Sequence, residues 1–338
     1  MTEIPPFQQL LTMTDLLVPA AVRAAATLGI ADHIAAGATT AAEIAHRAGS
    51  APDVTGTLLR YLVEIKILES GPDGEYALTP LGDPLRSDHP QSVRQVLRND
   101  GMIGSITLSL LRLDHTVRTG RPGYAAEFGR EYWDAVNTDP AFVAEWREQG
   151  EAADELDKQV LRWDAGKIIS EYDWSGVDSF MDVGGHLGSL TMALARAHPH
   201  LHGTLLDLRN VSAEAGRRFA RSDVADRVTA VQGSFFDPLP PGKDVYLLSA
   251  ILADWSDDEA VLILKRCREA AGATGRVLVA DIAMPVSGPG SELQLRSMMP
   301  APTRTAEDIE RLGAEAGLQV SWRGPATAVR TLIEFTAH

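Results

Sequence analysis

The stretch that decides the fold is Met181-Asp182-Val183-Gly184-Gly185-His186-Leu187-Gly188-Ser189-Leu190. A largely apolar run over residues 177–183 carries Asp182 near its end, breaks into glycines, and gives way to a helical pattern over residues 189–197. A strand, a tight glycine turn and a helix N-terminus in this order are the place where an α/β sheet holds a nucleotide-like cofactor. The glycines let the backbone approach the ligand closely. The stretch therefore predicts an α/β fold with a cofactor loop, against the alternative of an ordinary strand-to-helix turn.

A second acidic residue favours the cofactor loop. Asp207 ends the next apolar run, roughly 20 residues further on, where ribose hydroxyls need an acceptor. The dinucleotide fingerprint Gly-x-Gly-x-x-Gly does not fit, because His186 stands where its second glycine would be. No Lys or Arg lies between residues 181 and 195 to meet a pyrophosphate. The pattern therefore points to a cofactor other than a dinucleotide.

The order of an acid followed by Gly-Gly-x-x-Gly resembles motif I of S-adenosylmethionine-dependent methyltransferases. Gly233–Pro240 resembles the adenine segment of that family, Asp244–Ser249 its fourth strand, and Leu252–Asp257 its Leu-His-Asp-Trp-x-Asp box. With Val117–Pro122 upstream, most of the chain is similar to the plant caffeate-type and bacterial natural-product O-methyltransferases. The resemblance implies S-adenosyl-L-methionine as cofactor. It also implies a binding site made of Asp182, Gly184, Gly185, Asp207, Leu208, Ser234, Phe235 and Ser249.

The resemblance further implies an acceptor. The bacterial relatives methylate hydroxyls on aromatic polyketides and related acids. Trp146, Met298 and Met299 fall where the family lines its acceptor pocket, although apolar residues on helices are more often core. His115 lies in the expected lid and is a candidate pocket residue, against the reading of a solvated or capping histidine.

Composition limits the class of partner. The chain has 338 residues, long enough for two domains, and a formal net charge of −15, which argues against binding nucleic acid phosphates. Its single cysteine, Cys267, excludes an intramolecular disulfide and fits a reducing cytoplasm. The most apolar segment, residues 16–36, carries charged residues and is not expected to span a membrane. We expect a cytoplasmic protein, and no Cys/His spacing indicates a metal site.

Residues 1–100 are predicted to form a winged-helix domain. Thr40 and Glu43 have the capping-box spacing ahead of one helix, and a second helix starts at Pro52 and runs to about residue 67. A Gly-Pro-Asp-Gly turn then joins two short strands, 68–70 and 76–78.

A winged helix-turn-helix pattern ordinarily means DNA binding. Here the second helix mixes Asp53 and Glu64 with Arg60 and Lys66 and offers no basic face. In the resembled family the same module dimerises. We therefore expect a homodimer without nucleic acid.

The rest of the chain is predicted to form two further parts. Residues 101–172 read as a helical linker and substrate lid, with helices over 102–113, 124–136 and 141–163. Residues 173–338 read as a Rossmann-like S-adenosylmethionine-binding catalytic domain. Its strands are expected at 177–183, 203–208, 228–232, 244–249, 276–282, 318–323 and 329–336. The last connection is too short for a parallel crossover, so we predict the seven-stranded methyltransferase sheet with one reversed edge strand.

One family residue is missing. The resembled family uses a histidine in the Leu-His-Asp-Trp box to take the acceptor proton, and Ala253 stands at that position here. Asp281 and Thr303 stand where orienting glutamates are common. A positioned general base contributes roughly 10²–10⁴-fold, whereas in-line placement of the methyl group is worth about 7–11 kcal/mol without any base. Methyl transfer therefore survives if the acceptor is already anionic or another base serves, and the catalytic residue stays unknown.

Two neighbours of the cofactor are weak substitutes for the base. His186 is expected to shape the loop rather than to transfer protons, and Asp254 corresponds to a structural aspartate of the family.

Three hypotheses remain. The leading one is an S-adenosylmethionine-dependent O-methyltransferase acting on a small aromatic or polyketide acceptor. The alternative is a methyltransferase-fold enzyme that keeps the cofactor for decarboxylation, hydroxylation or pericyclic chemistry. The third is a catalytically silent binding protein, which the cofactor loop, Asp207 and Phe235 disfavour.

Overall fold

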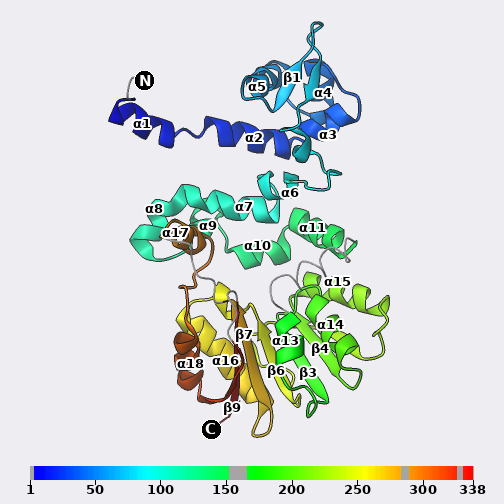
Figure 1. Ribbon diagram of the computed structural model, residues 1–338, viewed down its shortest axis with the longest axis vertical. Coiled ribbons are helices and arrows are strands. Elements are labelled where there is room, and N and C mark those ends of the chain that lie inside the picture. Colours follow the sequence, from blue (N-terminus) through cyan, green and yellow to red (C-terminus); the bar gives the residue numbers. More distant parts are fainter. Residues whose placement is uncertain (1–3, 152–165, 283–288, 326–329, 338) are drawn as a thin grey trace. The chain divides into compact units, whose positions relative to one another are not determined.

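A computed structural model describes residues 4–151, 166–282, 289–325 and 330–337 of the chain (Figure 1). Its contacts divide the chain into two compact units, Met1–Leu108 and Ser109–His338. The finer division into three parts at residues 100 and 172 stays a prediction.

The first unit is a helical domain with a two-stranded wing. The strands β1 (Leu68–Ser70) and β2 (Tyr76–Leu78) pair antiparallel. The predicted capping box is present, because the Thr40 hydroxyl accepts from the Glu43 N–H and the Glu43 carboxylate accepts from the Thr40 N–H. The helices are α1 (Pro6–Met13), α2 (Leu17–Thr27), α3 (Ile30–Ala35), α4 (Ala41–Ala48), α5 (Pro52–Glu64), α6 (Arg94–Leu97) and α7 (Met102–Leu108), with a 3-10 turn η1 at Asp83–Leu85.

Helices α1 and α2 leave an apolar surface uncovered. Leu10, Leu11 and Met13 are 63%, 66% and 82% exposed, and none of the residues of α1 is buried. By length and composition alone the stretch Pro6–Thr27 would also pass as a membrane span, a weak indication for a single helical stretch near the N-terminus. Exposed apolar surface of this kind marks a site of contact with another protein or with a membrane.

The helices that open the second unit are shorter than predicted. The expected helix over 124–136 is interrupted at Gly129, whose φ of 72° ends α9 in the left-handed conformation that favours glycine. The expected helix over 102–113 ends in a 3-10 turn, η2 (Ser109–Arg112), and only the first part of the expected helix over 141–163 lies within the described residues. The elements are α8 (Leu113–Thr119), α9 (Gly123–Phe128), α10 (Tyr132–Thr138), α11 (Pro140–Glu151) and α13 (Gly166–Glu171).

A seven-stranded sheet forms the body of the second unit, in the order β5-β4-β3-β6-β7-β9-β8. Its strands are β3 (Ser179–Val183), β4 (His202–Asp207), β5 (Val228–Gln232), β6 (Val245–Ser249), β7 (Arg276–Ile282), β8 (Leu318–Arg323) and β9 (Arg330–Ala337). The predicted α/β class and the seven strands are confirmed.

The position predicted for the reversed strand is wrong. β9 runs antiparallel to both of its neighbours, but it lies between β7 and β8, so that the edge strand is β8. The crossover through α18 (Ala306–Glu315) leaves a gap of one strand beside β7. β9 returns from β8 through a hairpin, fills this gap and pairs with both β7 and β8.

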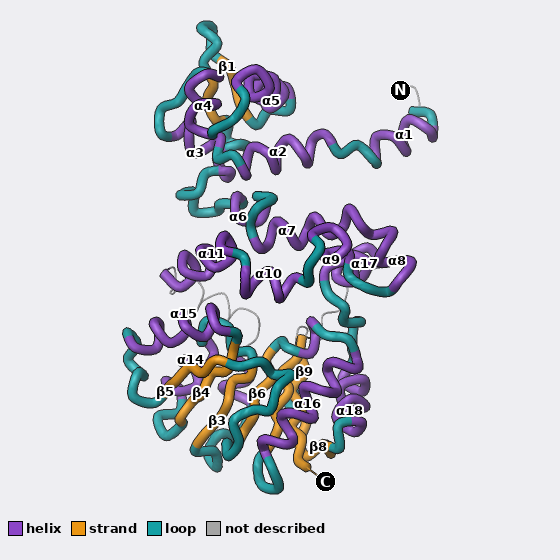
Figure 2. The backbone as a smooth tube through the Cα atoms, turned by 180° about the vertical axis from the view of Figure 1, so that it is seen from behind, coloured by secondary structure: helices purple, strands orange, loops and turns teal. Residues whose placement is uncertain are grey.

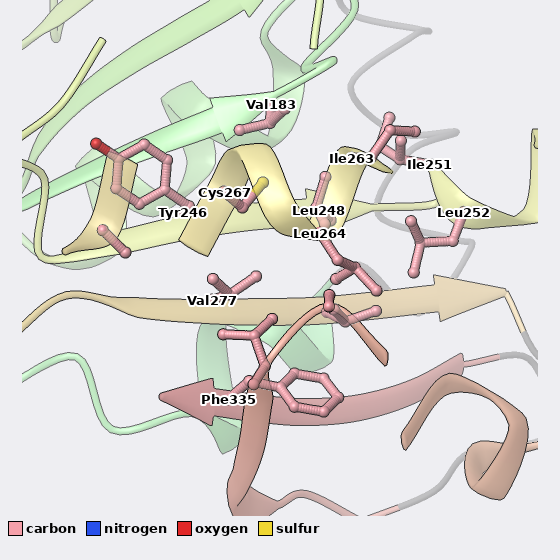
Figure 3. Close-up of a cluster of buried hydrophobic side chains, with 14 of the residues drawn as sticks. Val183, Tyr246, Leu248, Ile251, Leu252, Ile263, Leu264, Cys267, Val277 and Phe335 are labelled. Atoms are coloured by element: carbon pink, nitrogen blue, oxygen red, sulfur yellow. The ribbon is translucent and has the colours of Figure 1, made fainter. Parts of the chain in front are cut away.

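Helices cover both faces of the sheet. α14 (Ser189–Ala197) and α15 (Arg209–Ala220) pack on one face, and α16 (Asp257–Ala271) and α18 pack on the other (Figure 2). Figure 3 shows the core on the face that α16 and α18 cover, where Leu264 and Cys267 of α16 pack against Val277 and Phe335 of the sheet. Cys267 is fully buried, so it is core as expected. α17 (Pro289–Met298) lies between β7 and α18 in the chain.

Candidate functional site

A cavity of about 280 Å³ opens at the carboxyl ends of β3, β4, β5 and β6. This edge of a parallel sheet is where α/β folds place their ligands. Of the predicted cofactor residues, those on the cavity wall are Gly184, Asp207, Leu208, Ser234 and Phe235. The others, Asp182, Gly185 and Ser249, are not on the wall.

The glycine loop is built around Asp182. Its carboxylate is buried and accepts a hydrogen bond from the Thr191 hydroxyl at 2.6 Å, and burial raises its pKa to about 6. A Cβ on Gly185 would lie 2.7 Å from this carboxylate, and one on Gly184, whose φ is +75°, would lie 2.5 Å from Ile251. Asp182 and Gly185 therefore shape the loop from behind the wall, and the wall admits no side chain at Gly184.

Asp207 lies at the end of β4 and faces the loop. Its two carboxylate oxygens accept from the backbone N–H groups of His186 at 2.9 Å and Leu208 at 2.7 Å. Burial raises the pKa of Asp207 to about 7, although these hydrogen bonds act in the opposite direction. Asp207 is therefore a half-buried acceptor whose charge changes near neutral pH.

His186 also lines the cavity. Its φ of 56° is a left-handed value that side chains other than glycine rarely adopt. Burial, with a smaller contribution from Arg218, lowers its pKa to about 4, so the imidazole is neutral at physiological pH.

Aromatic rings make the far wall of the cavity. Phe235, Phe236 and Trp255 meet edge to face, with ring centroids 4.8–5.6 Å apart. The Ser234 hydroxyl accepts from the Phe236 N–H at 3.2 Å. Such a wall suits a flat, apolar ring.

Helix α10 contributes four wall residues that the sequence analysis missed: Trp133, Asp134, Val136 and Asn137. The Trp133 ring stacks on Trp255 with centroids 6.5 Å apart and an interplanar angle of 27°. The sequence shows only that Trp133 and Asn137, four residues apart, share one side of a helix; it does not show that this side faces the cavity.

Asp254 lies on the cavity wall, although the sequence analysis discounted it as structural. It ends a 3-10 turn, Leu252–Asp254, that follows β6. Burial, together with the nearby Asp281, raises the pKa of Asp254 to about 7. The preceding residue, Ala253, is tied to Asp281 by a backbone hydrogen bond of 3.2 Å.

Arg304 holds this turn in place. Its guanidinium donates to the carbonyls of Leu252 and Trp255 and to Asp257 at 2.8 Å, and its side chain is only 4% exposed. Its neighbour Thr303 is exposed, so the segment that the sequence analysis aligned for an orienting acid supplies a buried cation instead.

Three of the remaining predicted site residues, Met298, Met299 and His115, are not on the described cavity wall. Met298 and Met299 are half-buried at the end of α17, and His115 is half-buried in α8. Trp146 belongs to α11, and its side chain lies outside the described part of the structure. Among the described residues, no cluster of His, Cys, Asp and Glu could hold a metal ion.

Arg330 holds the side chain of Ser249 in place. Its hydroxyl accepts from the Arg330 guanidinium at 2.9 Å, and the same guanidinium donates to the Ala280 carbonyl at 2.8 Å.

Comparisons with known families agree with this geometry. The O-methyltransferase domain model matches residues 111–319, and the O-methyltransferase dimerisation domain model matches residues 10–88. The chain belongs to the O-methyltransferase family. It is an S-adenosylmethionine-dependent O-methyltransferase.

Two curated relatives and one solved structure are similar to this chain over most of its length. It is 40% identical to the 2,7-dihydroxy-5-methyl-1-naphthoate 7-O-methyltransferase of Streptomyces carzinostaticus, over 96% of each chain. It is 36% identical to the aclacinomycin 10-hydroxylase RdmB of Streptomyces purpurascens, over 96% of this chain and 88% of the relative. The crystal structure of NcsB1, an O-methyltransferase from neocarzinostatin biosynthesis, in complex with S-adenosyl-L-homocysteine and 1,4-dihydroxy-2-naphthoic acid has a TM-score of 0.83 and 39% identity, covering all of both chains.

Proposed function

We propose that the protein transfers a methyl group from S-adenosyl-L-methionine to a hydroxyl of a small aromatic or polyketide acceptor, without a histidine as general base. The observation that carries the proposal is the cavity at the sheet edge. Its wall joins an aromatic face to half-buried carboxylates, and the described part of its lining contains Asp134, Asp207 and Asp254 but no Lys or Arg.

The lining fits the proposed cofactor. An acidic wall without a cation is unfavourable for phosphate and favourable for a sulfonium cation. Asp207 would accept from the ribose hydroxyls, Ser234 and Phe235 would meet the adenine, and Ser249 would approach the methionine end. When bound, the cofactor supplies an electrophilic methyl group to the acceptor oxygen.

The acceptor class is inferred from the relatives. The naphthoate O-methyltransferase and the NcsB1 complex both concern hydroxylated naphthoic acids. An aromatic hydroxyl conjugated with a carbonyl fits a site in which Ala253 supplies no base, because the carbonyl delocalises the phenolate charge and lowers the pKa of the hydroxyl.

Asp254 is our candidate for the proton acceptor. Of the titratable groups on the described wall, His186 has a pKa near 4 and Asp207 is engaged by the loop, whereas Asp254 has a pKa near 7. A general base is most effective when its pKa lies near the working pH.

We further propose that the protein works as a homodimer. The dimerisation-domain match spans α2 and most of the first unit, and the apolar surface of α1 and α2 is the kind of surface that a second copy covers. A monomer by light scattering at micromolar concentration would contradict this.

One observation favours the alternative reaction class, namely the 36% identity to a hydroxylase. The deciding experiment incubates the protein with S-adenosyl-L-methionine and a hydroxynaphthoic acid and follows both molecules by mass. A methylated acceptor with equimolar S-adenosyl-L-homocysteine supports the proposal. An acceptor altered while the cofactor stays intact would overturn it in favour of the alternative.

A further inference from the structure

The chain leaves β6 through a strained turn, Ser249–Ile251, which we call the exit turn. Its middle residue, Ala250, has a φ of 58°, a left-handed value that residues with a Cβ rarely adopt. This conformation costs free energy for alanine and is freely available to glycine. A strained residue of this kind persists only where the surrounding structure holds it.

One buried arginine contacts the exit turn. Arg330 begins β9 and is only 4% exposed. Its guanidinium donates to the Ser249 hydroxyl at 2.9 Å and to the Ala280 carbonyl at 2.8 Å. The same Ala280 carbonyl accepts the N–H of Ala250 at 3.1 Å. The arginine therefore holds the residue before Ala250 directly and also holds the carbonyl to which Ala250 is anchored.

The same guanidinium acts on the glycine loop. Burial raises the pKa of Asp182, at the end of β3, to about 6, and the Thr191 hydroxyl and Arg330 act in the opposite direction. Arg330 thus interacts with the carboxyl ends of β3, β6 and β7, at the sheet edge where the cavity opens.

The exit turn fixes the position of Ile251. This side chain is buried and lines the cavity. A Cβ on Gly184 would lie 2.5 Å from the Ile251 Cδ1, so Ile251 packs directly against the backbone of the glycine loop. A change of Ala250 to a negative φ would redirect the chain at this point and move Ile251 out of this contact. The shape of the cavity between β6 and the glycine loop therefore depends on the strained turn.

We propose that Arg330 is a positioning residue that holds the exit turn in its strained conformation, so that Ile251 completes the cavity wall. Arg330 is not on the described wall, so it acts through the turn and not on a ligand. The inference rests on the proposed function, because it assumes that this cavity holds the cofactor.

The test is a double-mutant cycle on ligand affinity, built from Arg330→Met and Ala250→Gly. Glycine adopts the left-handed conformation without strain, so the exit turn then depends less on the arginine. Calorimetry with S-adenosyl-L-homocysteine measures binding to the full-length protein. Arg330→Met alone should weaken binding by about tenfold, the value of one good buried hydrogen bond. In the Ala250→Gly background the same change should weaken binding by only about threefold, because glycine keeps the turn.

A second arginine of the sheet provides the matched control. Arg276 begins β7, at the end of that strand away from the cavity, and pairs with Glu334 at 3.5 Å. Arg276→Met should leave the affinity for S-adenosyl-L-homocysteine unchanged, with alanine or with glycine at position 250. Urea unfolding checks that each variant is folded. Where Arg330→Met does not unfold cooperatively, Arg330→Gln takes its place in the cycle, because its neutral amide still donates a hydrogen bond.

The outcomes separate the inference from the proposed function. If the arginine substitution weakens binding equally in both backgrounds, Arg330 supports the sheet and not the turn, and the inference is overturned. If the folded variant binds as tightly as wild type, the inference also falls while the proposed function stands. If the wild-type protein does not bind S-adenosyl-L-homocysteine, the proposed function itself is wrong and the inference falls with it.

Discussion

The carboxylate of Asp207 accepts the backbone N–H of His186 at 2.9 Å. The residue predicted to bind the ribose therefore also holds the one loop position that has a left-handed φ and a side chain other than hydrogen. The protonation of one carboxyl thus affects both the shape of the glycine loop and the acceptor available to a ligand.

Cofactor affinity should depend on pH through Asp207. Its pKa is raised to about 7 by burial, so the ionised form that we propose accepts from the ribose hydroxyls is lost as the pH falls through 7. We expect S-adenosyl-L-homocysteine to bind more weakly at pH 6 than at pH 8 by calorimetry. Asp207→Ala should weaken binding by about 1.5–3 kcal/mol and flatten this dependence. Unchanged affinity in the variant would remove Asp207 from the site.

Without cofactor, the free energy of unfolding should change with pH in the opposite direction to cofactor affinity, which gives an internal control. A carboxyl with a raised pKa in the folded state binds its proton more tightly there than in the unfolded chain. Its contribution to the free energy of unfolding is therefore largest below the unfolded pKa, about 4, and declines as the pH rises through 7. Thermal unfolding of wild type and Asp207→Ala between pH 5 and pH 8 measures this difference.

The sheet was predictable because each strand is a short apolar run bounded by polar residues. The limits of β5, β7 and β8 agree with the predicted ones. The place of β9 was not predictable from its neighbours in the chain, because the hairpin with β8 fixes its direction but not on which side it pairs.

The site residues at the strand ends were predictable from the sequence, whereas those that α10 contributes were not. Asp207 and Phe235 follow strands, and parallel strands deliver their carboxyl ends to one edge of the sheet. Trp133 and Asn137 come from α10, whose placement over that edge depends on tertiary packing that no local pattern records. Arg304 escaped notice for the same reason, since its partners are 47 to 52 residues away in the chain.

His186→Gly should stabilise the protein by about 0.5–1 kcal/mol. A left-handed conformation costs roughly 1–2 kcal/mol for a residue with a Cβ, and glycine loses part of this gain through its freer unfolded chain. Urea unfolding measures the change. As a control, Ala193→Gly inside α14 should destabilise by about 1 kcal/mol. A loss of stability in His186→Gly would mean that packing of the imidazole outweighs the strain.

Arg304→Met should loosen the turn that carries Asp254. The carbonyls of Leu252 and Trp255 lose their donor, and each buried group left unpaired costs about 1–3 kcal/mol. We expect a loss of about 3 kcal/mol in the free energy of unfolding. The matched control is Arg311→Met, which removes an exposed guanidinium from the same partner, Asp257, and should change the free energy of unfolding far less because solvent screens this ion pair. Equal losses in the free energy of unfolding of the two variants would show that Arg304 does not hold the turn.

Asp254→Asn should lower the methylation rate by about 10²-fold at pH 8. The wild-type rate should rise with pH through about 7, where the Asp254 carboxyl ionises, and the variant should lose this rise. Asp134 also lines the cavity, but its side chain is exposed. Asp134→Asn should therefore keep the wild-type dependence of the rate on pH. A wild-type profile in Asp254→Asn would assign proton acceptance elsewhere or to no residue at all.

Ala253→His should introduce a base at the position that we propose corresponds to the family's histidine. Ala253 donates its N–H to Asp281 and precedes Asp254, so a new imidazole would lie near two carboxyls. These carboxyls hold it protonated to a higher pH, which limits its use as a base. For an ordinary phenol we expect a gain of up to about 10²-fold in kcat/KM, the lower end of general-base catalysis, and a smaller gain for a phenol whose hydroxyl is made more acidic by a conjugated carbonyl. Rates for the two acceptors are measured side by side across pH 6 to 9. Equal gains would mean that the acidity of the acceptor does not compensate for the missing histidine.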